Sequence, residues 1–478
     1  MIMLMSKSEL KSESILSSKS KSESNSYNGS LDDGSLDDGS SDDGSLDDGS
    51  SDDGSSDDGS SDDGSSERSY ISTSSDDICH HSENLDLTGK LLNKYNIINE
   101  IGKGADAIVW LGYNVEDSKF YAIKVNEPNE YKKGLEEFKF LKKLPIKLQV
   151  FNHLKESFIE QKGNLKYSCG VFELHTGNLD SLIRKSDIED GLPIHVVKKI
   201  MYQLLTAIKY LHQKVKVYHA DIKTDNILLK GQNSFDKIII EQYTSQNFIK
   251  KYTESKKQFW LNKGNNLNSI NKMKSIDKKK IREVVHKHIC EKLEYPDTLE
   301  KYKINQELIS NCNVTLSDFG TYCKEDEHYD TEFGTRYYRA PEIILMGETS
   351  YGVDIWALGC VFYELLTGRI LFDPEKDSKH SRDEYHLWWI NSYCGDFPIN
   401  FLKKTKHYRK FFNNSGKLLN MKLSNTSSIK ELLESYNILN EIENITDLLK
   451  GMLEISPLKR FDINKCLNHV FFSENVIN

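Results

Sequence analysis

No part of the chain limits the choice of fold as strongly as residues 218–229, "YHADIKTDNILL". The preceding segment, "PIHVVKKIMYQLLTAIKYLHQ", spaces its apolar residues at helix period, whereas "NILLK" reads as a strand. Residues 219–226 therefore predict a loop between a helix and a strand. The helix stripe comprises Val196, Ile200, Leu204, Ile208 and Leu211.

The side chains of this loop are those that phosphoryl transfer needs. Asp221 could accept a proton from a substrate hydroxyl, Lys223 could neutralise a transferring phosphate, and Asn226 could ligate magnesium. Asp318, in "SDFG" after a short strand-like run, would supply the second metal ligand. The spacing H-x-D-x-K-x-x-N thus predicts a magnesium-dependent phosphoryl-transfer site.

A glycine turn and a lysine add to this prediction. "GKGADAIVW" is a G-x-G-x-x-A turn between two strand-like runs, and Gly102 and Gly104 allow backbone amides to approach phosphate oxygens. Asp106 lies at the expected tip of the turn, where its charge could repel a polyphosphate. Lys124 ends the apolar run "YAIK", so its ammonium needs an anionic partner in a cleft. Glu137 on the next predicted helix is the candidate, and Glu136 is its rival.

The chain changes texture along its length. Residues 1–88 contain few aromatics, and residues 31–65 are seven five-residue repeats of the type LDDGS or SDDGS with 14 aspartates. The formal net charge of −10 therefore belongs to this tract, and the rest of the chain is near +4. Such a tail cannot bury enough apolar surface to offset the entropy of ordering, so we expect disorder. Strand-like runs with one helix, predicted over 134–144, come next, and helical patterns follow, which predicts a two-lobed α+β protein.

Residues 231–311 interrupt the helical part with 16 basic and 10 acidic residues. We interpret them as a polar, basic insertion on the surface. "KKKIR" within it could also act as a nuclear-import or nucleic-acid patch, although its apolar neighbours favour packing.

Taken in order, these motifs resemble the signature of the eukaryotic protein kinases. The resemblance implies a bilobal protein kinase fold, with a small β-rich N-lobe and hinge at 91–175 and a large α-helical C-lobe at 176–230 and 312–475. It implies ATP and Mg²⁺ as cofactors, with Asn226 and Asp318 on the metal and Thr335 bracing the catalytic residues Asp221 and Lys223. The ATP-binding residues that it implies are Ile101, Gly102, Lys103, Gly104, Ala105, Asp106, Ala107, Ile108, Val109, Ala122, Lys124, and Phe172, Glu173 and His175 of the hinge.

Further landmarks resemble one group within this family. "TRYYRAPE" contains the A-P-E motif, and Arg460 resembles the salt-bridge partner of its glutamate, Glu342. Asp354 resembles the aspartate that braces the catalytic loop. Arg339, just before the A-P-E motif, is typical of the CMGC group. Within that group the chain is most similar to the SR-protein kinases. Like them, it has a non-arginine residue between the histidine and the aspartate of the catalytic loop (Ala220), a C-lobe split by a long insertion and a "SRDE-x-H" element.

The same resemblance predicts regulation and substrate. Ala220 replaces the arginine that grips a phosphorylated activation loop, and Asp330 and Glu332 already stand near the phosphoacceptor positions. We expect activity without activation-loop phosphorylation. The acids around 373–384 could bind an Arg/Ser-rich protein substrate, or they could form a solvated acidic loop. This acidic group comprises Asp373, Glu375, Asp377, Asp383 and Glu384.

Partners and location follow from composition. The eight cysteines are scattered without a C-x-x-C pair, which favours reduced thiols in the cytoplasm or nucleus, and no apolar run is long enough to span a membrane. We expect an intracellular, non-secreted monomer that acts on proteins and binds neither membranes nor nucleic acid. The alternative function is a pseudokinase scaffold, for which Asp106 and Ala107 are the only support. A small-molecule kinase is disfavoured by the A-P-E segment.

Overall fold

The computed structural model describes residues 85–87, 90–114, 116–117, 119–175, 177–185, 191–230, 312–325, 327, 332–421 and 427–473. The chain divides into two units, Met1–Ile71 and Ser72–Asn478, and every described residue belongs to the second. The repeat tract and the insertion at 231–311 lie outside these residues. No helix in the described ranges has the length and apolarity that crossing a bilayer requires.

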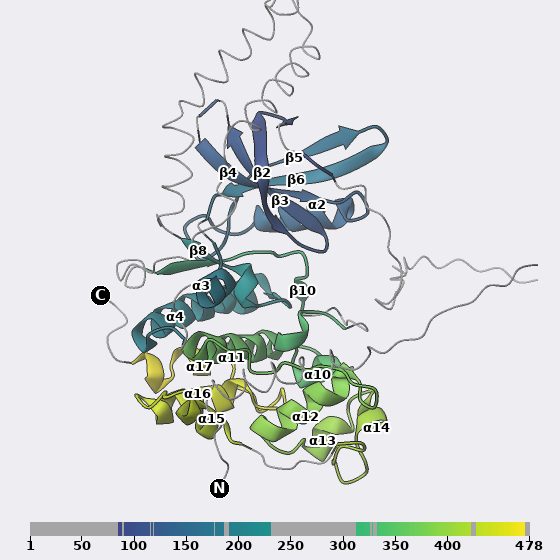
Figure 1. Cartoon of the computed structure of the whole chain (residues 1–478), viewed down its shortest axis with the longest axis vertical. Helices are drawn as coiled ribbons and strands as arrows, with labels where there is room; N and C mark the ends of the chain where they lie inside the picture. The colour runs from purple at the N-terminus through teal and green to yellow at the C-terminus, as the bar shows by residue number, and fades with distance from the viewer. Residues whose placement is uncertain are drawn as a thin grey trace, which may run out of the picture. The chain divides into compact units, whose positions relative to one another are not determined.

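The first lobe is an antiparallel sheet of six strands with one helix against it (Figure 1). The strand order is β1-β2-β3-β4-β6-β5, so β4 lies in the interior, between β3 and β6. The elements are β1 (Leu91–Leu92), β2 (Tyr95–Lys103), β3 (Ala107–Asn114), β4 (Lys119–Asn126), α2 (Tyr131–Leu141), β5 (Leu154–Lys162) and β6 (Leu165–Glu173).

Alternation along β3 and β4 gives this sheet two different faces. Ile108, Ile123 and Val125 are buried in an apolar cluster on one face. Ala122 and Lys124 point to the opposite face, which α2 covers by packing Phe138 against β6. The alternation along these strands therefore determines which side chains, such as Lys124, can extend toward the second lobe.

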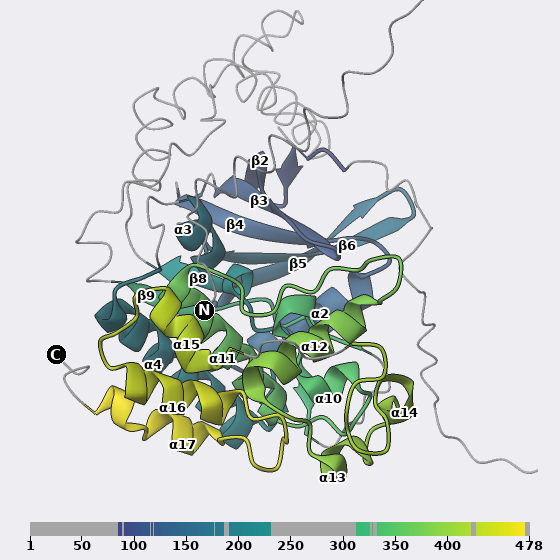
Figure 2. The same cartoon turned by 60° about the horizontal axis from the view of Figure 1, so that its bottom comes forward.

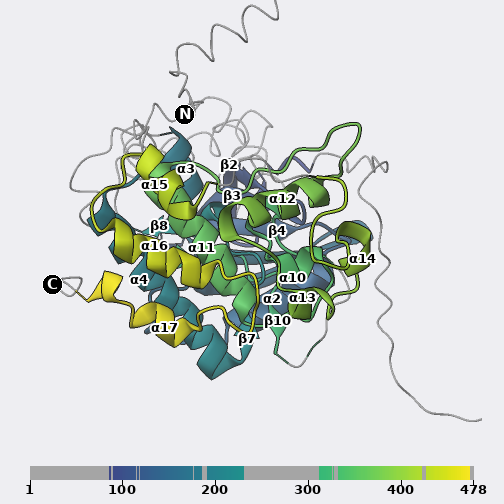
Figure 3. The ribbon, with the colours of Figure 1, turned by 90° about the horizontal axis from the view of Figure 1, so that it is seen from below.

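The second lobe is helical and is built around α11 (Gly352–Thr367), which is buried along its length (Figure 2). Seen from below, α11 lies among α4, α10, α12 and α16 (Figure 3). The other helices are α3 (Leu179–Lys185), α4 (Ile194–Tyr210), α10 (Pro341–Ile344), α12 (Arg382–Cys394), α13 (Ile399–Leu402), α14 (Tyr408–Phe411), α15 (Ile429–Ser435), α16 (Ile442–Met452) and α17 (Ile463–Leu467). Single turns are η1 (Leu211–Val215), η2 (Thr224–Asn226), η3 (Arg336–Tyr338) and η4 (Val470–Phe472).

Two short antiparallel pairs carry the polar loops on the side of this lobe that faces the sheet. The strand β8 (Ile227–Lys230) pairs with β9 (Asn313–Leu316), and β7 (Val217–Tyr218) pairs with β10 (Cys323–Lys324). The register Ile227↔Leu316 places Asn226 beside Ser317, and therefore close to Asp318. Segments on both sides of the insertion thus meet at one place.

The expected α+β architecture, strand-rich first and helix-rich second, is confirmed. The helix predicted over 134–144 is shifted, because α2 runs from Tyr131 to Leu141. The backbone N–H of Lys142 donates to the carbonyl of Phe138, and the N–H of Lys143 donates to the carbonyl of Phe140, an i→i−3 bond that tightens the last turn. Pro145 disfavours helical geometry at the residue just before it.

Candidate active site

Lys124 on β4 is the cation that links the two lobes. Its Nζ lies 3.0 and 2.9 Å from the two carboxylate oxygens of Glu137 and 2.8 Å from Oδ1 of Asp318. Burial alone would lower the pKa of Lys124, but the two carboxylates outweigh it and raise the pKa. Glu137 is buried on α2, whereas its neighbour Glu136 is exposed. The structure therefore pairs Lys124 with Glu137 rather than Glu136.

Asp318 follows β9 in a strained backbone conformation. Its φ of 60° lies in the left-handed region, which a non-glycine residue adopts at a cost. Phe319 holds the segment in place, because its fully buried ring packs on Phe140, Phe151 and His219. Burial opposes ionisation of Asp318, yet the nearby Lys124 lowers its pKa to about 2. The carboxylate is therefore ionised at neutral pH and available to a cation.

Asp354 on α11 fixes the loop before β8. Its buried carboxylate accepts the backbone N–H of His219 at 2.8 Å and of Ala220 at 3.0 Å, and Nε2 of His212 lies 2.9 Å away. Ala220 has a φ of 69°, so these bonds hold a conformation that alanine would otherwise avoid. The ring of His219 contacts the carbonyl of Ser317 at 3.0 Å, which joins the loop to the segment of Asp318.

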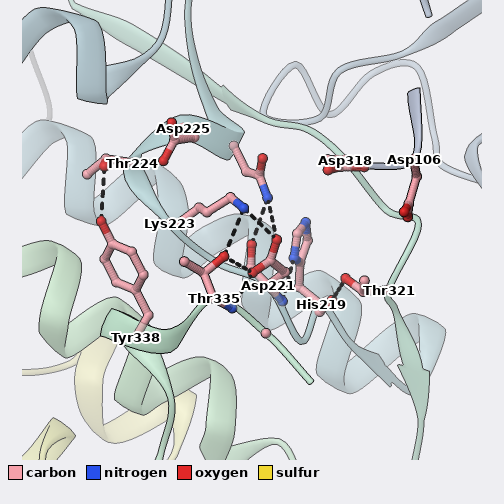
Figure 4. Close-up of polar contacts among 12 residues, drawn as sticks. Asp106, His219, Asp221, Lys223, Thr224, Asp225, Asp318, Thr321, Thr335 and Tyr338 are labelled. Atoms are coloured by element: carbon pink, nitrogen blue, oxygen red, sulfur yellow. Dashed lines mark hydrogen bonds and ion pairs between the residues drawn. The ribbon is translucent and has the colours of Figure 1, made fainter. Parts of the chain in front are cut away.

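Asp221 stands at the centre of a polar cluster (Figure 4). Its Oδ1 accepts hydrogen bonds from the N–H and the hydroxyl of Thr335, both at 2.8 Å, and its Oδ2 lies 3.0 Å from Nζ of Lys223. Nζ of Lys223 also donates to the Thr335 hydroxyl at 2.8 Å. Burial would raise the pKa of Asp221, but Lys223 and Thr335 lower it. The carboxylate is therefore oriented and ionised.

Asn226 is oriented by the same cluster. Its amide nitrogen donates to the backbone oxygen of Asp221 at 2.9 Å and to Oδ2 at 3.1 Å, so its amide oxygen is the atom left for a ligand. Both the N–H and the hydroxyl of Ser317 donate to the Asn226 carbonyl at 2.9 Å, which ties Asn226 to the Asp318 segment. Amide and carboxylate oxygens suit Mg²⁺, which keeps waters and phosphate oxygens as its other ligands. Among the described residues no group of three or more His, Cys, Asp or Glu side chains could hold a metal alone.

The glycine turn closes the end of the β2–β3 hairpin. Gly104 donates its N–H to the carbonyl of Ala107 at 2.9 Å, and Asp106 lies at the tip, as expected. The side chains of Ile101, Lys103 and Ala105 are exposed there. Of the apolar residues in this segment, Val109 pairs across the strands with Lys124 and shares its face. The side chain of Ile108 is buried in the apolar cluster on the opposite face, so a contact of Ile108 with a nucleotide would have to come from its backbone.

The segment after β6 lies where the two lobes join. Phe172 pairs with Ala122 and packs its buried ring against Phe138, with centroids 6.5 Å apart. Glu173 ends β6 with an exposed side chain. The ring of His175 contacts Oδ1 of Asn152 at 3.2 Å, and burial lowers the pKa of His175 to about 4. The backbone of the segment expected to form the hinge is therefore flanked by the apolar rings of Phe172 and Phe138 and by the neutral imidazole of His175.

The comparison with known families agrees with this geometry. The model of the protein kinase domain matches residues 95–240 and 262–472, which is most of the chain. The chain belongs to the protein kinase family. The match therefore confirms the expected two-lobed kinase fold, in which an insertion splits the C-lobe.

Its relatives are protein kinases, several of them named as serine/threonine-protein kinases. The putative serine/threonine-protein kinase L205 of Acanthamoeba polyphaga mimivirus is 27% identical, over 80% of this kinase and 88% of the relative. Protein kinase dsk1 of Schizosaccharomyces pombe is 25% identical over 80% and 81%, and serine/threonine-protein kinase SRPK of Physarum polycephalum is 26% identical over 80% and 86%. The kinase is a protein serine/threonine kinase, and its resemblance to the SR-protein kinases is confirmed.

The activation segment, from Asp318 of the D-F-G motif to Glu342 of the A-P-E motif, contains contacts that the sequence pattern did not indicate. The hydroxyl of Tyr338 donates to the buried Glu364 of α11 at 2.7 Å, and Arg184 of α3 reaches the other oxygen of Glu364 at 2.7 Å. Burial raises the pKa of Glu364 to about 7. The available signal was a single acid in the apolar run "GCVFYELL". Glu332 forms ion pairs with Arg336 and Arg339, whereas Asp330 lies outside the described residues.

The A-P-E glutamate is paired as the resemblance implied. Glu342 accepts two hydrogen bonds from Arg460, at 2.6 and 2.9 Å, and both side chains are almost fully buried. Arg460 also donates to the carbonyl of Gly352 at the start of α11. The pair therefore joins the activation segment to the core helix and to the C-terminal helices.

Proposed function

We propose that this kinase transfers the γ-phosphoryl group of ATP to a serine or threonine hydroxyl of a protein through the cluster around Asp221. The observation that supports this most strongly is the convergence of two constellations. Lys124 joins Glu137 to Asp318 across the lobes, and Asp221 is held by Lys223, Thr335 and Asn226. Residues from five separate segments of the chain meet there.

Each residue has a role that its contacts support. Asp221 orients the substrate hydroxyl and accepts its proton, and Thr335 fixes the carboxylate that does so. Lys223 places a cation where charge develops on the phosphoryl group. Lys124, held by Glu137, binds the phosphates of the nucleotide. Asn226 and Asp318 would hold Mg²⁺, which screens the phosphate charge when bound.

One assay distinguishes an active kinase from a pseudokinase scaffold. Magnesium-dependent transfer from γ-labelled ATP is measured for the wild type and for Asp221→Asn, with Asp447→Asn as a control that removes an exposed acid. We expect the Asp221 variant to lose about two or more orders of magnitude in kcat, and the control to match the wild type. Equal rates for all three proteins, or no transfer by any of them, would refute the proposal.

We also propose that the kinase is active without phosphorylation of its activation segment. Ala220 offers no guanidinium to a phosphate, while the carboxylate of Glu332 already pairs with Arg336 and Arg339. A built-in acid thus takes the place of a phosphate as the partner of these arginines. Protein expressed in bacteria and treated with phosphatase is expected to retain full activity. A requirement for prior treatment by another kinase would contradict this.

For the substrate we propose an Arg/Ser-rich protein segment, with a smaller docking surface than the sequence indicated. Asp383 forms an ion pair with Arg336, Glu384 caps α12 through Ser381, and Asp377 accepts from Tyr385. Asp373 and Glu375 remain exposed. These two acids are therefore the ones we assign to guanidinium binding. Peptide arrays are expected to favour Arg-Ser repeats over acidic or proline-directed peptides.

The compartment that we propose is intracellular and reducing. The six cysteines of the described residues are all free thiols, and five of them are buried. Disulfides do not contribute to the stability of this part of the chain, as expected of a cytoplasmic or nuclear protein.

A further inference from the structure

The tip of the glycine turn is tied to α2 by an ion pair. The carboxylate of Asp106 contacts Nζ of Lys133, and Glu130 lies 3.8 Å from the same nitrogen. Lys133 stands one helical turn before Glu137 on α2. Lys133, which binds Asp106 at the loop tip, and Glu137, which orients Lys124, therefore lie on the same face of α2.

The position of Lys133 brings its charge close to Asp318. A Cβ placed on Gly320 would lie 3.9 Å from Cε of Lys133 and 3.6 Å from Oδ1 of Asp318, so both side chains flank this glycine. In Figure 4, Asp106 and Asp318 appear on the same side of the Asp221 cluster. Burial would lower the pKa of Lys133, but Asp106, Glu130 and Asp318 together raise it. The ammonium therefore stays charged between the loop tip and the expected phosphate site.

An aspartate at this tip needs such a partner. A carboxylate over a polyphosphate repels it, and exclusion of water from a closed site strengthens the repulsion. The ion pair with Lys133 cancels the charge of Asp106 and holds the carboxylate toward α2.

We propose that Lys133 is a positioning residue for the nucleotide: it neutralises Asp106 and fastens the glycine turn to α2, so that the turn can close over the phosphates. The inference rests on the nucleotide site of the proposed function. It predicts that the harm done by losing Lys133 comes from the charge of Asp106 and disappears with that charge.

The test is equilibrium binding of Mg²⁺·ATP, with adenosine in the same Mg²⁺-containing buffer as a probe that lacks phosphates. The variants are Lys133→Met, Lys133→Arg, Asp106→Asn and the double variant Asp106→Asn/Lys133→Met. Lys132→Met removes the exposed neighbouring lysine of α2 and serves as the matched control. The wild type is measured first, because failure to bind ATP at all would refute the proposed function and not this inference.

Lys133→Met is expected to raise the Kd for ATP about three- to tenfold, with little change for adenosine. The double variant is expected to return to within about twofold of the wild type, and Lys133→Arg to bind as the wild type does. The same pattern should appear in KM for ATP, with kcat nearly unchanged. A double variant as weak as Lys133→Met would show that Lys133 binds phosphate directly and would overturn the inference. So would a Lys133→Met variant that matches Lys132→Met.

Discussion

At the scale of single residues, a small number of side chains orients Asp221, and Thr335 is the most important of them. The hydroxyl of Thr335 donates to Asp221 while it accepts from Lys223, so one side chain aligns the acid and the cation together. The N–H of Thr335 adds a second bond to the same carboxylate oxygen. Backbone strain at Ala220 and Asp318, on either side of this cluster, indicates that the surrounding fold holds the loops in place.

Glu364 gives a prediction for the pH dependence of stability. Its pKa rises from an ordinary 4.5 to about 7 on folding, so between these values the folded state binds more protons than the unfolded state. Stability that comes from this group is therefore present below pH 4.5 and is lost as the pH rises toward 7. Relative to Glu364→Gln, the unfolding free energy of the wild type should fall by up to about 3 kcal/mol over this window. Denaturant titrations at pH 5 and pH 8 check this, and a difference that does not change with pH would contradict it.

At the scale of elements, α11 organises the second lobe. Its buried acids serve different segments: Asp354 holds the catalytic loop, and Glu364 holds Tyr338 of the activation segment. The ion pair of Glu342 and Arg460 connects α10 to the C-terminal helices. Because these groups are buried, the fold leaves them few other partners, and both active-site loops depend on one rigid helix.

The buried ion pair should matter far more than an exposed one. Arg460→Met leaves Glu342 charged and unpaired, and it is expected to lower the free energy of unfolding by about 3–5 kcal/mol. Glu342→Leu in the same protein removes the orphaned charge and should recover most of this loss. Glu443→Gln breaks the exposed pair with Lys430 and should cost at most about 0.5 kcal/mol. Calorimetric or denaturant unfolding measures all three, and equal costs for Arg460→Met and Glu443→Gln would contradict the prediction.

Two kinds of residue could be predicted from the sequence: those that lie close together along the chain, and those whose place in an alternating pattern decides the face of the sheet on which they lie. The loop at 219–226 follows from an apolar helix period and a strand, and Lys124 follows from the alternation in β4. The contact of Asp106 with Lys133 could not be predicted, because it depends on where the tip of a hairpin lies above a helix. The contacts of Glu364 with Tyr338 and Arg184 could not be predicted either, because the periodicity of an apolar helix does not show which residue pairs with a buried acid. The shift of α2 by three residues reflects the weak sequence control of helix ends.

At the scale of the whole molecule, the residues that we propose for phosphate binding and for catalysis lie on different lobes. The first lobe supplies Lys124, Glu137 and the glycine turn, and the second supplies Asp221, Asn226 and Asp318. Lys124 contacts Asp318 directly, so the lobes meet at the point where a nucleotide and its cation would bind. If Asp318 holds the metal and Asp221 accepts the proton, metal binding and proton transfer should be separable functions of these two neighbouring carboxylates.

The dependence of ATP affinity on Mg²⁺, measured by calorimetry for the wild type, Asp318→Asn and Asp221→Asn, tests this separation most directly. We expect Mg²⁺ to tighten ATP binding to the wild type and to Asp221→Asn alike, and Asp318→Asn to lose this gain by about tenfold or more. Asp318→Asn that keeps the full Mg²⁺-dependent gain in affinity would contradict it.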